Sequence, residues 1–281
     1  MSDVAGAIDV HVHAGPSFFD RKYDAVELAE VAAEAGMEGV VLKSHFGDTH
    51  KPARLAARRA DVEVYSSVTL NSFVGGFNPV AVEHALETGA RVVWLPTFSA
   101  ANFRLEAIDR GFPFSRQSLR AVDDDGSVTD EARAVLETVG DTDRSVALGN
   151  GHLSREESFA VLEEMEEMGL SVPYLITHAD FPFMGLSVED QVELADRGAV
   201  IEKCYLPVVH GDLSVGTVVE SVEAIGAERC VLSTDHGQAN NESPPAAYAE
   251  FMKRLRDAGM GEDAIRALTR ESPRRLLGLD T

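Results

Sequence analysis

The sequence contains little cysteine and no long apolar stretch. Its two cysteines, Cys204 and Cys230, each lie inside an apolar, strand-like run. This placement indicates buried, reduced thiols in a cytoplasmic protein rather than a secreted disulfide framework. No run of about 18 apolar residues is present, so we expect neither a membrane-spanning helix nor a membrane partner. The N-terminus also lacks the basic start and apolar core of a signal peptide.

Basic residues are also scarce. Lysine and arginine together number 25 against 47 acidic residues, which gives a formal net charge of −22. Such a field repels phosphates, so nucleic acid is not an expected partner. The acidic residues are spread along the expected helices rather than gathered in a tail. The composition resembles that of proteins from salt-accumulating halophiles, so we expect a haloarchaeal source and a fold that is more stable at high salt.

Two common catalytic motifs are missing. The sequence has no Gly-x-Ser-x-Gly elbow for a nucleophilic serine and no phosphate-binding Gly-Lys-Ser/Thr loop. The segment 149–154 follows a strand and opens a helix, but it lacks the third small residue of a dinucleotide-binding turn. These absences direct attention away from serine hydrolases and nucleotide-binding proteins.

Short apolar runs alternate with amphipathic helical patterns along the whole chain. Eight expected strands cover residues 8–13, 39–45, 62–70, 91–98, 145–149, 172–177, 199–206 and 229–234. Eight strand–helix units in this length favour a closed (β/α)8 barrel of TIM type over an open sheet. With no linker-like segment, residues 1–281 are expected to form a single domain. A long connection after the fourth strand, residues 102–127, is either a functional lid or a plain surface excursion.

The first expected strand carries two histidines. His11 and His13 alternate with apolar residues, so in a regular strand they share one face with Asp9, while Val10 and Val12 lie on the other. Two imidazoles on one face, just before Gly15, form a ready pair of ligands for one metal ion. A chance pair is the alternative, since the chain has nine histidines.

Later strand ends repeat this pattern. His152 follows the fifth strand, His178 the sixth and Asp235 the eighth. In a parallel barrel these ends converge on one face, where catalytic residues gather. Imidazole and carboxylate ligands suit a divalent transition metal, so we expect zinc, as one ion or two, with manganese or iron as alternatives. Asp235 can also accept a proton from a metal-activated water, as a general base.

Together these residues resemble the ligand pattern of the amidohydrolase superfamily of metal-dependent hydrolases, and more narrowly one of its uncharacterised branches. The final segment, residues 271–279, is similar to the last helix of that superfamily. The resemblance implies a TIM barrel that hydrolyses an amide, lactone or related C–N or C–O bond of a small molecule. It also implies two positions for metal: the first held by His11, His13 and Asp235, the second by His152 and His178.

One position departs from the resemblance. Many members with two metals bridge them with a carboxylated lysine or a glutamate from strand four, and Trp94 to Thr97 contain neither. Lys43, embedded in the second strand, is the substitute candidate. It is either carbamylated or a cation that binds an anionic substrate. Alternatively, its stem packs in the core and its amine pairs with a neighbour such as Glu202.

Three further residues are candidates for contacts with substrate. His45 shares the face of Lys43 and is expected to act in catalysis, with a substrate contact or a wall residue as alternatives. Glu202 is expected to face inward and bind substrate, or to orient a metal ligand. Arg116 in the long connection can clamp a carboxylate or phosphate, although an ordinary surface arginine is the alternative.

Two other functions remain open. The same site can serve a phosphoesterase or a decarboxylase that uses its metal as a Lewis acid. A non-catalytic barrel that binds a ligand is the third possibility, but the presence of all five expected ligands argues against it. The expected partner is a small-molecule substrate, and a homo-oligomer is compatible with the sequence.

Overall fold

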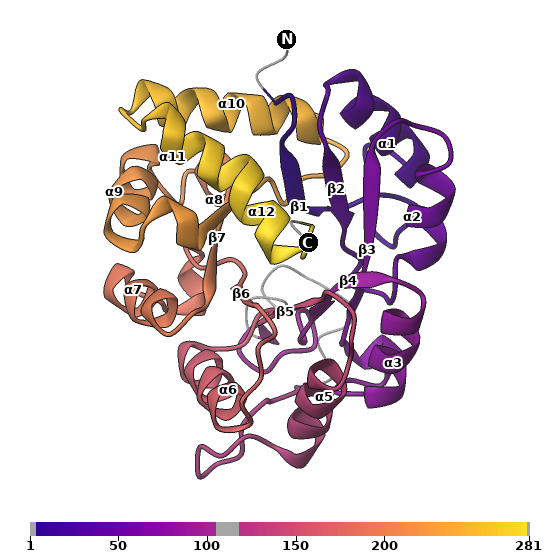
Figure 1. Cartoon of the computed structure of the whole chain (residues 1–281), viewed down its shortest axis with the longest axis vertical. Coiled ribbons are helices and arrows are strands. Elements are labelled where there is room, and N and C mark those ends of the chain that lie inside the picture. The colour runs from indigo at the N-terminus through magenta and orange to yellow at the C-terminus, as the bar shows by residue number, and fades with distance from the viewer. Residues whose placement is uncertain (1–3, 105–117, 280–281) are drawn as a thin grey trace.

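The computed structural model describes residues 4–104 and 118–279. Eight parallel strands form one sheet in chain order, with helices around its outside (Figure 1). The strands are β1 (Ile8–Val12), β2 (Gly39–Leu42), β3 (Glu63–Thr69), β4 (Ala90–Trp94), β5 (Ala147–Gly149), β6 (Tyr174–Ile176), β7 (Val200–Cys204) and β8 (Cys230–Ser233). The expected (β/α)8 barrel is therefore confirmed.

Helices follow the strands and pack their apolar faces against the outside of the barrel. They are α1 (Ala25–Glu34), α2 (His50–Ala56), α3 (Pro79–Glu87), α5 (Asp130–Gly140), α6 (Arg155–Glu167), α7 (Val188–Asp196), α8 (Leu206–His210), α9 (Val215–Ile225), α10 (Pro244–Asp257), α11 (Glu262–Arg266) and α12 (Ser272–Leu276). Local sequence fixes several of their starts. The Ser154 hydroxyl accepts from the backbone N–H of Glu157, whose carboxylate accepts from that of Ser154, which is a capping box at the start of α6.

The barrel closes between its first and last strands. The backbone N–H of Asp235 donates to the carbonyl of His11 (3.0 Å), and the N–H of His13 donates to the carbonyl of His236 (2.8 Å). Beside them the buried Asp9 carboxylate accepts from the hydroxyl (2.6 Å) and the backbone N–H (3.2 Å) of Thr234. Closure thus depends on the same short segments that carry three of the expected metal ligands.

Strand β1 is not regular, which changes the expected facing of its side chains. Its pairing with β2 shifts register between Asp9 and Val12, as at a β-bulge. Ile8 and Val10 consequently pack in the inner apolar cluster of the barrel, whereas Val12 packs in the outer cluster beneath the helices. The expectation that Val10 and Val12 share a face was wrong, because one extra residue in the strand reverses its alternation. Because of the same bulge, the His11 side chain points into the barrel interior, as the Val10 side chain does.

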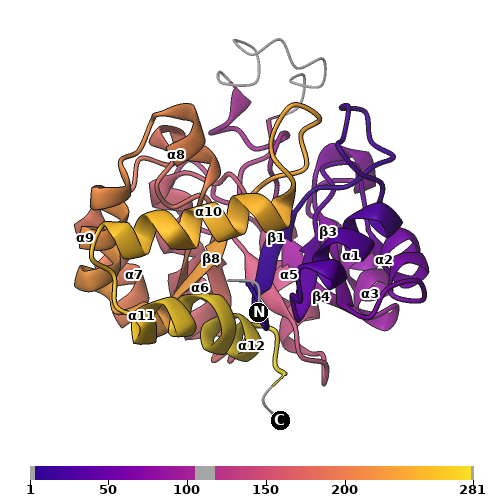
Figure 2. The ribbon, with the colours of Figure 1, turned by 90° about the horizontal axis from the view of Figure 1, so that it is seen from above.

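The N-terminal end of the barrel is covered by the closing helices. Figure 1 shows α12 lying across this end, and Leu276 and Leu277 join the inner cluster with Ile8 and Val10. The amphipathic pattern of residues 262–277 is that of a single helix. The structure instead has α11, a π-helical segment (Ala267–Glu271) and then α12. Figure 2 shows α8, a short helix that the sequence did not predict, at the opposite end of the barrel.

Two smaller features complete the fold. In the long connection after β4, Val122 pairs antiparallel with Val128, so residues 122–128 form a small hairpin. Both cysteines are free and buried, as expected. Among the described residues, no helix combines the length and apolarity needed to cross a lipid bilayer.

Candidate active site

The structure brings the expected ligands together at the C-terminal end of the barrel. The buried side chains form two groups, and within each group the possible ligand atoms all lie within 4.8 Å of one another. The first group comprises His11, His13 and Asp235, and the second comprises His11, His178, Glu202 and Cys204. His152 adjoins these groups, because its ring centroid lies 5.0 Å from that of His178. Residues from five well-separated parts of the chain therefore lie together in one buried region.

Glu202 fixes the orientation of His11. The His11 Nδ1 lies 2.9 Å from Glu202 Oε1, while Glu202 Oε2 accepts from the Thr177 hydroxyl and from the His178 backbone N–H. Burial works against the charge on Glu202, but His11 outweighs it and holds the glutamate pKa below its usual range. An ionised carboxylate can only accept, so His11 donates from Nδ1 and its Nε2 is free to bind a cation.

His13 has the same arrangement with a different partner. Its Nδ1 lies 2.8 Å from the backbone carbonyl of Lys43, which can only accept, so the proton of the neutral ring is on Nδ1. Burial, with help from Arg21, lowers the pKa of His13 to about 3, so the ring is neutral. Its bare Nε2 then faces Asp235 Oδ1 at 3.0 Å.

These atoms fit a divalent cation. Asp235 Oδ1 lies 3.1 Å from His11 Nε2, but not in hydrogen-bond geometry, and 3.0 Å from His13 Nε2. Burial opposes ionisation of Asp235, yet the two histidines hold its pKa well below the usual range. Burial and Lys43 lower the pKa of His11, but Asp235 and Glu202 outweigh them and raise it above its usual value. The two ring nitrogens and the carboxylate therefore converge at one point that favours a positive charge, a proton or a metal cation, between them. Histidines whose other nitrogen donates to a carboxylate or carbonyl are the usual metal ligands.

Two of these residues have a strained backbone. His178 (φ 58°) and Asp235 (φ 53°) are the non-glycine residues with positive φ among those described. This region is costly for residues with a Cβ and persists where the surroundings enforce it, often at functional sites. The conformation of Asp235 is held by the hydrogen bond from its backbone N–H to the His11 carbonyl. That of His178 is held by the hydrogen bond from its backbone N–H to the Glu202 carboxylate.

His152 is buried without polar partners. Both of its ring nitrogens are inaccessible and lack a hydrogen bond, which costs roughly 1–3 kcal/mol for a buried polar group. Burial holds its pKa well below the usual range, so the ring is neutral and has a free lone pair. Gly151 positions it, because a Cβ there would lie 2.3 Å from the Leu95 carbonyl oxygen. A neutral imidazole with no partner fits a metal ligand.

Lys43 lies in the interior with an unpartnered amine. Its Nζ is buried, has no hydrogen bond and sits 4.4 Å from the centre of the Trp94 ring. The alternative in which this amine pairs directly with Glu202 was therefore wrong. Burial lowers the pKa of Lys43, although Asp235 and Glu202 oppose the shift. Trp94 reaches this position because residue 149 is glycine, since a Cβ there would lie 2.3 Å from the indole.

An open cavity leads to these groups. It has a volume of about 260 Å³, and its lining includes His13, His45 and Asp235. The His45 Nδ1 lies 2.9 Å from the Thr97 hydroxyl, and its ring stacks on Phe98 with centroids 3.7 Å apart. His45 is thus a wall of the cavity beside the expected metal ligands. Arg116 falls in residues 105–117, outside the part of the chain that the structure describes.

Sequence reasoning missed two residues here. Arg21 lines the cavity from the loop after β1, and only the scarcity of basic residues distinguished it in the sequence. Cys204 was interpreted as a structural thiol, yet its Sγ lies 3.7 Å from His178 Nδ1. Its position two residues after Glu202, on the same strand face, was the available signal.

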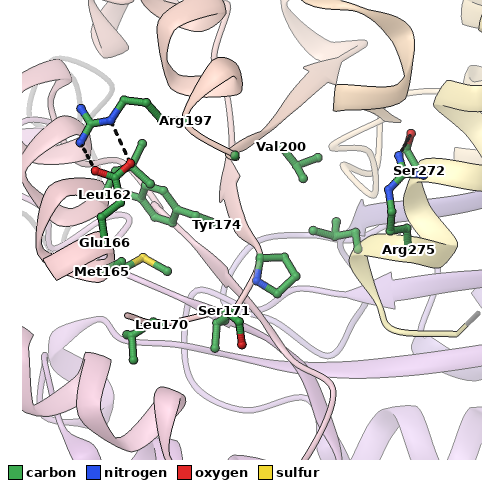
Figure 3. A pocket seen from close by; sticks show the side chains of 14 residues that line it. Leu162, Met165, Glu166, Leu170, Ser171, Tyr174, Arg197, Val200, Ser272 and Arg275 are labelled. Atoms are coloured by element: carbon green, nitrogen blue, oxygen red, sulfur yellow. Dashed lines mark hydrogen bonds and ion pairs between the residues drawn. The ribbon is translucent and has the colours of Figure 1, made fainter. Parts of the chain in front are cut away.

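A second cavity, of about 370 Å³, lies at the opposite end of the barrel (Figure 3). Both arginines that line it are already paired within the chain. Arg197 makes two hydrogen bonds to Glu166, at 3.0 and 2.6 Å, and Arg275 donates to the Ser272 hydroxyl. This end of a (β/α)8 barrel normally contributes to stability rather than to chemistry. The smaller cavity is therefore the candidate active site.

The fold of this chain is found among several known enzymes. Similar structures include an amidohydrolase from Pseudomonas aeruginosa, with 14% identity, coverage of 97% of this chain and 95% of that chain, and a TM-score of 0.65. A 2,6-dihydroxybenzoate decarboxylase from Rhizobium is 14% identical, with coverage of 99% and 100% and a TM-score of 0.61. The phosphotriesterase homology protein of Escherichia coli, complexed with phosphate in its active site, is 12% identical, with coverage of 98% and 99% and a TM-score of 0.61.

The chain itself belongs to a family of unknown function, DUF6282, whose match spans residues 6–202. No curated protein matches the sequence. The similar structures share the barrel expected from the amidohydrolase resemblance. They include a hydrolase, a decarboxylase and a phosphotriesterase homologue, so the choice of reaction depends on the residues of this site.

Proposed function

We propose that this protein is a metal-dependent hydrolase that cleaves an amide, lactone or related bond of a small molecule. The observation that supports it most is the convergence of His11 Nε2, His13 Nε2 and Asp235 Oδ1 at one buried point. His152 and His178 extend this set of donors to a second position. Zinc is the expected ion, with manganese or iron as alternatives.

The roles of the chain's own residues follow from their contacts. A bound divalent cation would supply Lewis acidity toward a carbonyl and lower the pKa of water. Glu202 and the Lys43 carbonyl hold the two histidines in the tautomer that binds cations. Asp235 Oδ2, the oxygen that does not face these histidines, can receive a proton from the attacking water and return it to the leaving group. It lies 3.9 Å from His178 Nδ1, which can orient it.

The remaining proposed roles concern the substrate. His45 can donate or accept a hydrogen bond at the cavity wall, because its ring is held by Thr97 and Phe98. Lys43 lies beneath the metal ligands, and its field favours negative charge that develops on the substrate during attack. Glu202 is fully buried and has three partners, so we propose that it orients His11 rather than contacting substrate.

Metal analysis combined with a substrate panel tests this function. Protein purified at high salt and loaded with zinc, manganese or iron should retain metal and hydrolyse members of a panel of amides and lactones. His13→Gln should lose both properties. His84→Gln, which alters an exposed histidine of α3, should keep them.

The outcomes separate the alternatives. Release of phosphate from esters, or of carbon dioxide from aromatic acids, without amide or lactone cleavage would replace the hydrolase by a phosphoesterase or a decarboxylase. Retention of less than about 0.3 metal ions per chain after loading would favour a non-catalytic barrel.

A further inference from the structure

We propose that the cavity binds an aromatic ligand carrying an oxyanion group, a carboxylate or a phosphate, and that Arg21 holds this group. The inference rests on the proposed function only for the chemistry that follows binding. It names the class of substrate, which neither the fold nor the metal ligands specify.

A cation, Arg21, lies at the wall of this cavity. Among the described residues its guanidinium makes no hydrogen bond or ion pair, and its Nε is buried. Burial lowers the pKa of Arg21, and Asp235 partly opposes the shift. Elsewhere in this acidic chain, arginines such as Arg133 and Arg197 pair with glutamates. A partly buried guanidinium whose Nε has no hydrogen bond loses part of its hydration without compensation, so its position favours an anion from outside the chain.

The backbone around Arg21 holds it in place. Arg21 forms an antiparallel bridge with Gln238, and the N–H of Lys22 donates to the carbonyl of Gly237 at 2.9 Å. The loop after β1 is thereby fixed to the loop after β8, which carries Asp235. Side chains on a fixed loop lose little freedom on binding, which favours a specific contact.

The rest of the cavity wall is aromatic. Phe19, Phe98 and Phe103 line it together with His45. Phe98 stacks on His45 and, with centroids 5.7 Å apart, on Phe103, while the Arg21 guanidinium lies 5.8 Å from the Phe19 ring centre. Such walls favour a flat, apolar ligand, and about 260 Å³ suits a molecule of one or two rings.

Two acidic residues also face this cavity and have to be weighed. Asp20 is exposed, so solvent screens its charge. Asp235 carries the negative charge that a bound cation would offset. With the charge of Asp235 offset by a cation and that of Asp20 screened by solvent, the positive charge of Arg21 at the cavity wall has no counter-charge among the described lining residues. A planar guanidinium contacts carboxylate or phosphate through two parallel hydrogen bonds, and that geometry selects oxyanions over neutral groups.

Calorimetry with four small probes tests this inference on the full-length, metal-loaded protein. Benzoate and phenyl phosphate carry the oxyanion, benzamide is the neutral match to benzoate, and benzylamine carries the opposite charge. We expect one of the two anions to bind at least tenfold more tightly than benzamide, and benzylamine not to bind. The tighter anion identifies the group as carboxylate or phosphate.

Variants of Arg21 provide the decisive comparison. Arg21→Gln should weaken binding of the preferred anion at least tenfold and leave benzamide unchanged, and Arg21→Lys should recover part of the loss. Arg120→Gln, which removes an exposed arginine paired with Asp124, is the matched control and should bind like the wild type. Equal affinity for benzoate, phenyl phosphate and benzamide, or a loss of less than twofold in a folded Arg21→Gln, would overturn the inference.

These results are independent of the hydrolase proposal. Metal-dependent turnover of neutral substrates, without anion binding, would refute the role of Arg21 and leave the hydrolase intact. Arg21-dependent anion binding without turnover of any panel substrate would support the role of Arg21 and refute the hydrolase proposal.

Discussion

The substitution Glu202→Gln probes how the proposed metal ligands are oriented. In the wild type one carboxylate oxygen faces His11 Nδ1 at 2.9 Å, and the other accepts from the Thr177 hydroxyl and the His178 N–H. A glutamine retains one acceptor oxygen. Because the His178 N–H can only donate, the amide oxygen should take that side and the amide N–H should face His11. His11 must then accept at Nδ1, which moves its proton to Nε2.

This change of tautomer should remove a metal ligand without unfolding the protein. With the proton on Nε2, His11 donates to Asp235 and no longer offers a lone pair beside it. Loss of an orienting partner typically lowers metal affinity by about 10–100-fold. This corresponds to about 1.4–2.8 kcal/mol. Since the glutamine keeps all three hydrogen bonds and removes a buried charge, we expect the unfolding free energy of the metal-free protein to change by less than about 1 kcal/mol.

Competition with a chelator measures the affinity, and nitrogen chemical shifts of the histidine rings report the tautomer. Glu220→Gln, on the exposed face of α9, is the control for a change of charge alone. If Glu202→Gln bound zinc within twofold of the wild type, or if His11 kept its proton on Nδ1, the assignment of Glu202 as an orienting residue would be refuted.

Three further predictions concern stability. A Cβ on Gly237 would lie 2.0 Å from the His13 carbonyl oxygen, so Gly237→Ala should lower the unfolding free energy by about 2 kcal/mol or more and lower the metal content. Gly169→Ala is the control, because Gly169 also has positive φ but lies in open space, and it should cost less stability. Equal urea midpoints for the two variants would contradict this prediction. Burial raises the pKa of Asp9 to about 7 from an ordinary 3.8, so its contribution to stability is complete below about pH 4 and is lost as pH rises through 7. The unfolding free energy of Asp9→Asn should therefore rise relative to that of the wild type between pH 5 and pH 8, by at most about 4 kcal/mol. A difference between the two proteins that stays constant over that range would refute the pKa shift. Because of its net charge of −22, the protein should have a higher thermal midpoint in 2 M than in 0.1 M potassium chloride, and a flat or falling midpoint would count against the halophilic interpretation.

Much of the fold could be predicted because its signals are local. Short apolar runs alternating with amphipathic helices define a parallel barrel, and caps such as Ser154 mark where helices begin. The departures arise where local pattern meets tertiary contact. Residues 262–277 have one helical period, but the structure places a π-helical segment within them, where α12 turns across the barrel end. The period of a sequence does not contain that information.

The membership of the site was predictable for a similar reason. Barrel closure brings all strand ends together, so a histidine or aspartate at a strand end is a candidate whatever its distance in sequence. The orientation of these side chains was not predictable in the same way. The bulge in β1 that turns His11 inward depends on pairing with β2, and the positive φ of His178 and Asp235 depends on contacts from other strands. Arg21 lies on a loop, where no periodicity exists to indicate which side chains face the cavity.

The position of Trp94 connects the departure at strand four to the number of metal ions. Where the amidohydrolase resemblance expects a bridging group there is an indole, accommodated by Gly149 and facing the Lys43 amine at 4.4 Å. The amine's positive charge contributes to lowering the pKa of both His152 and His178, so the same field opposes a second divalent cation beside them. Burial lowers the pKa of Lys43 itself, which weakens that opposition to the extent that the amine loses its proton. Metal number and the charge on Lys43 are therefore coupled: a charged amine favours one ion at His11 and its partners, and two ions require that the amine be neutral or carbamylated.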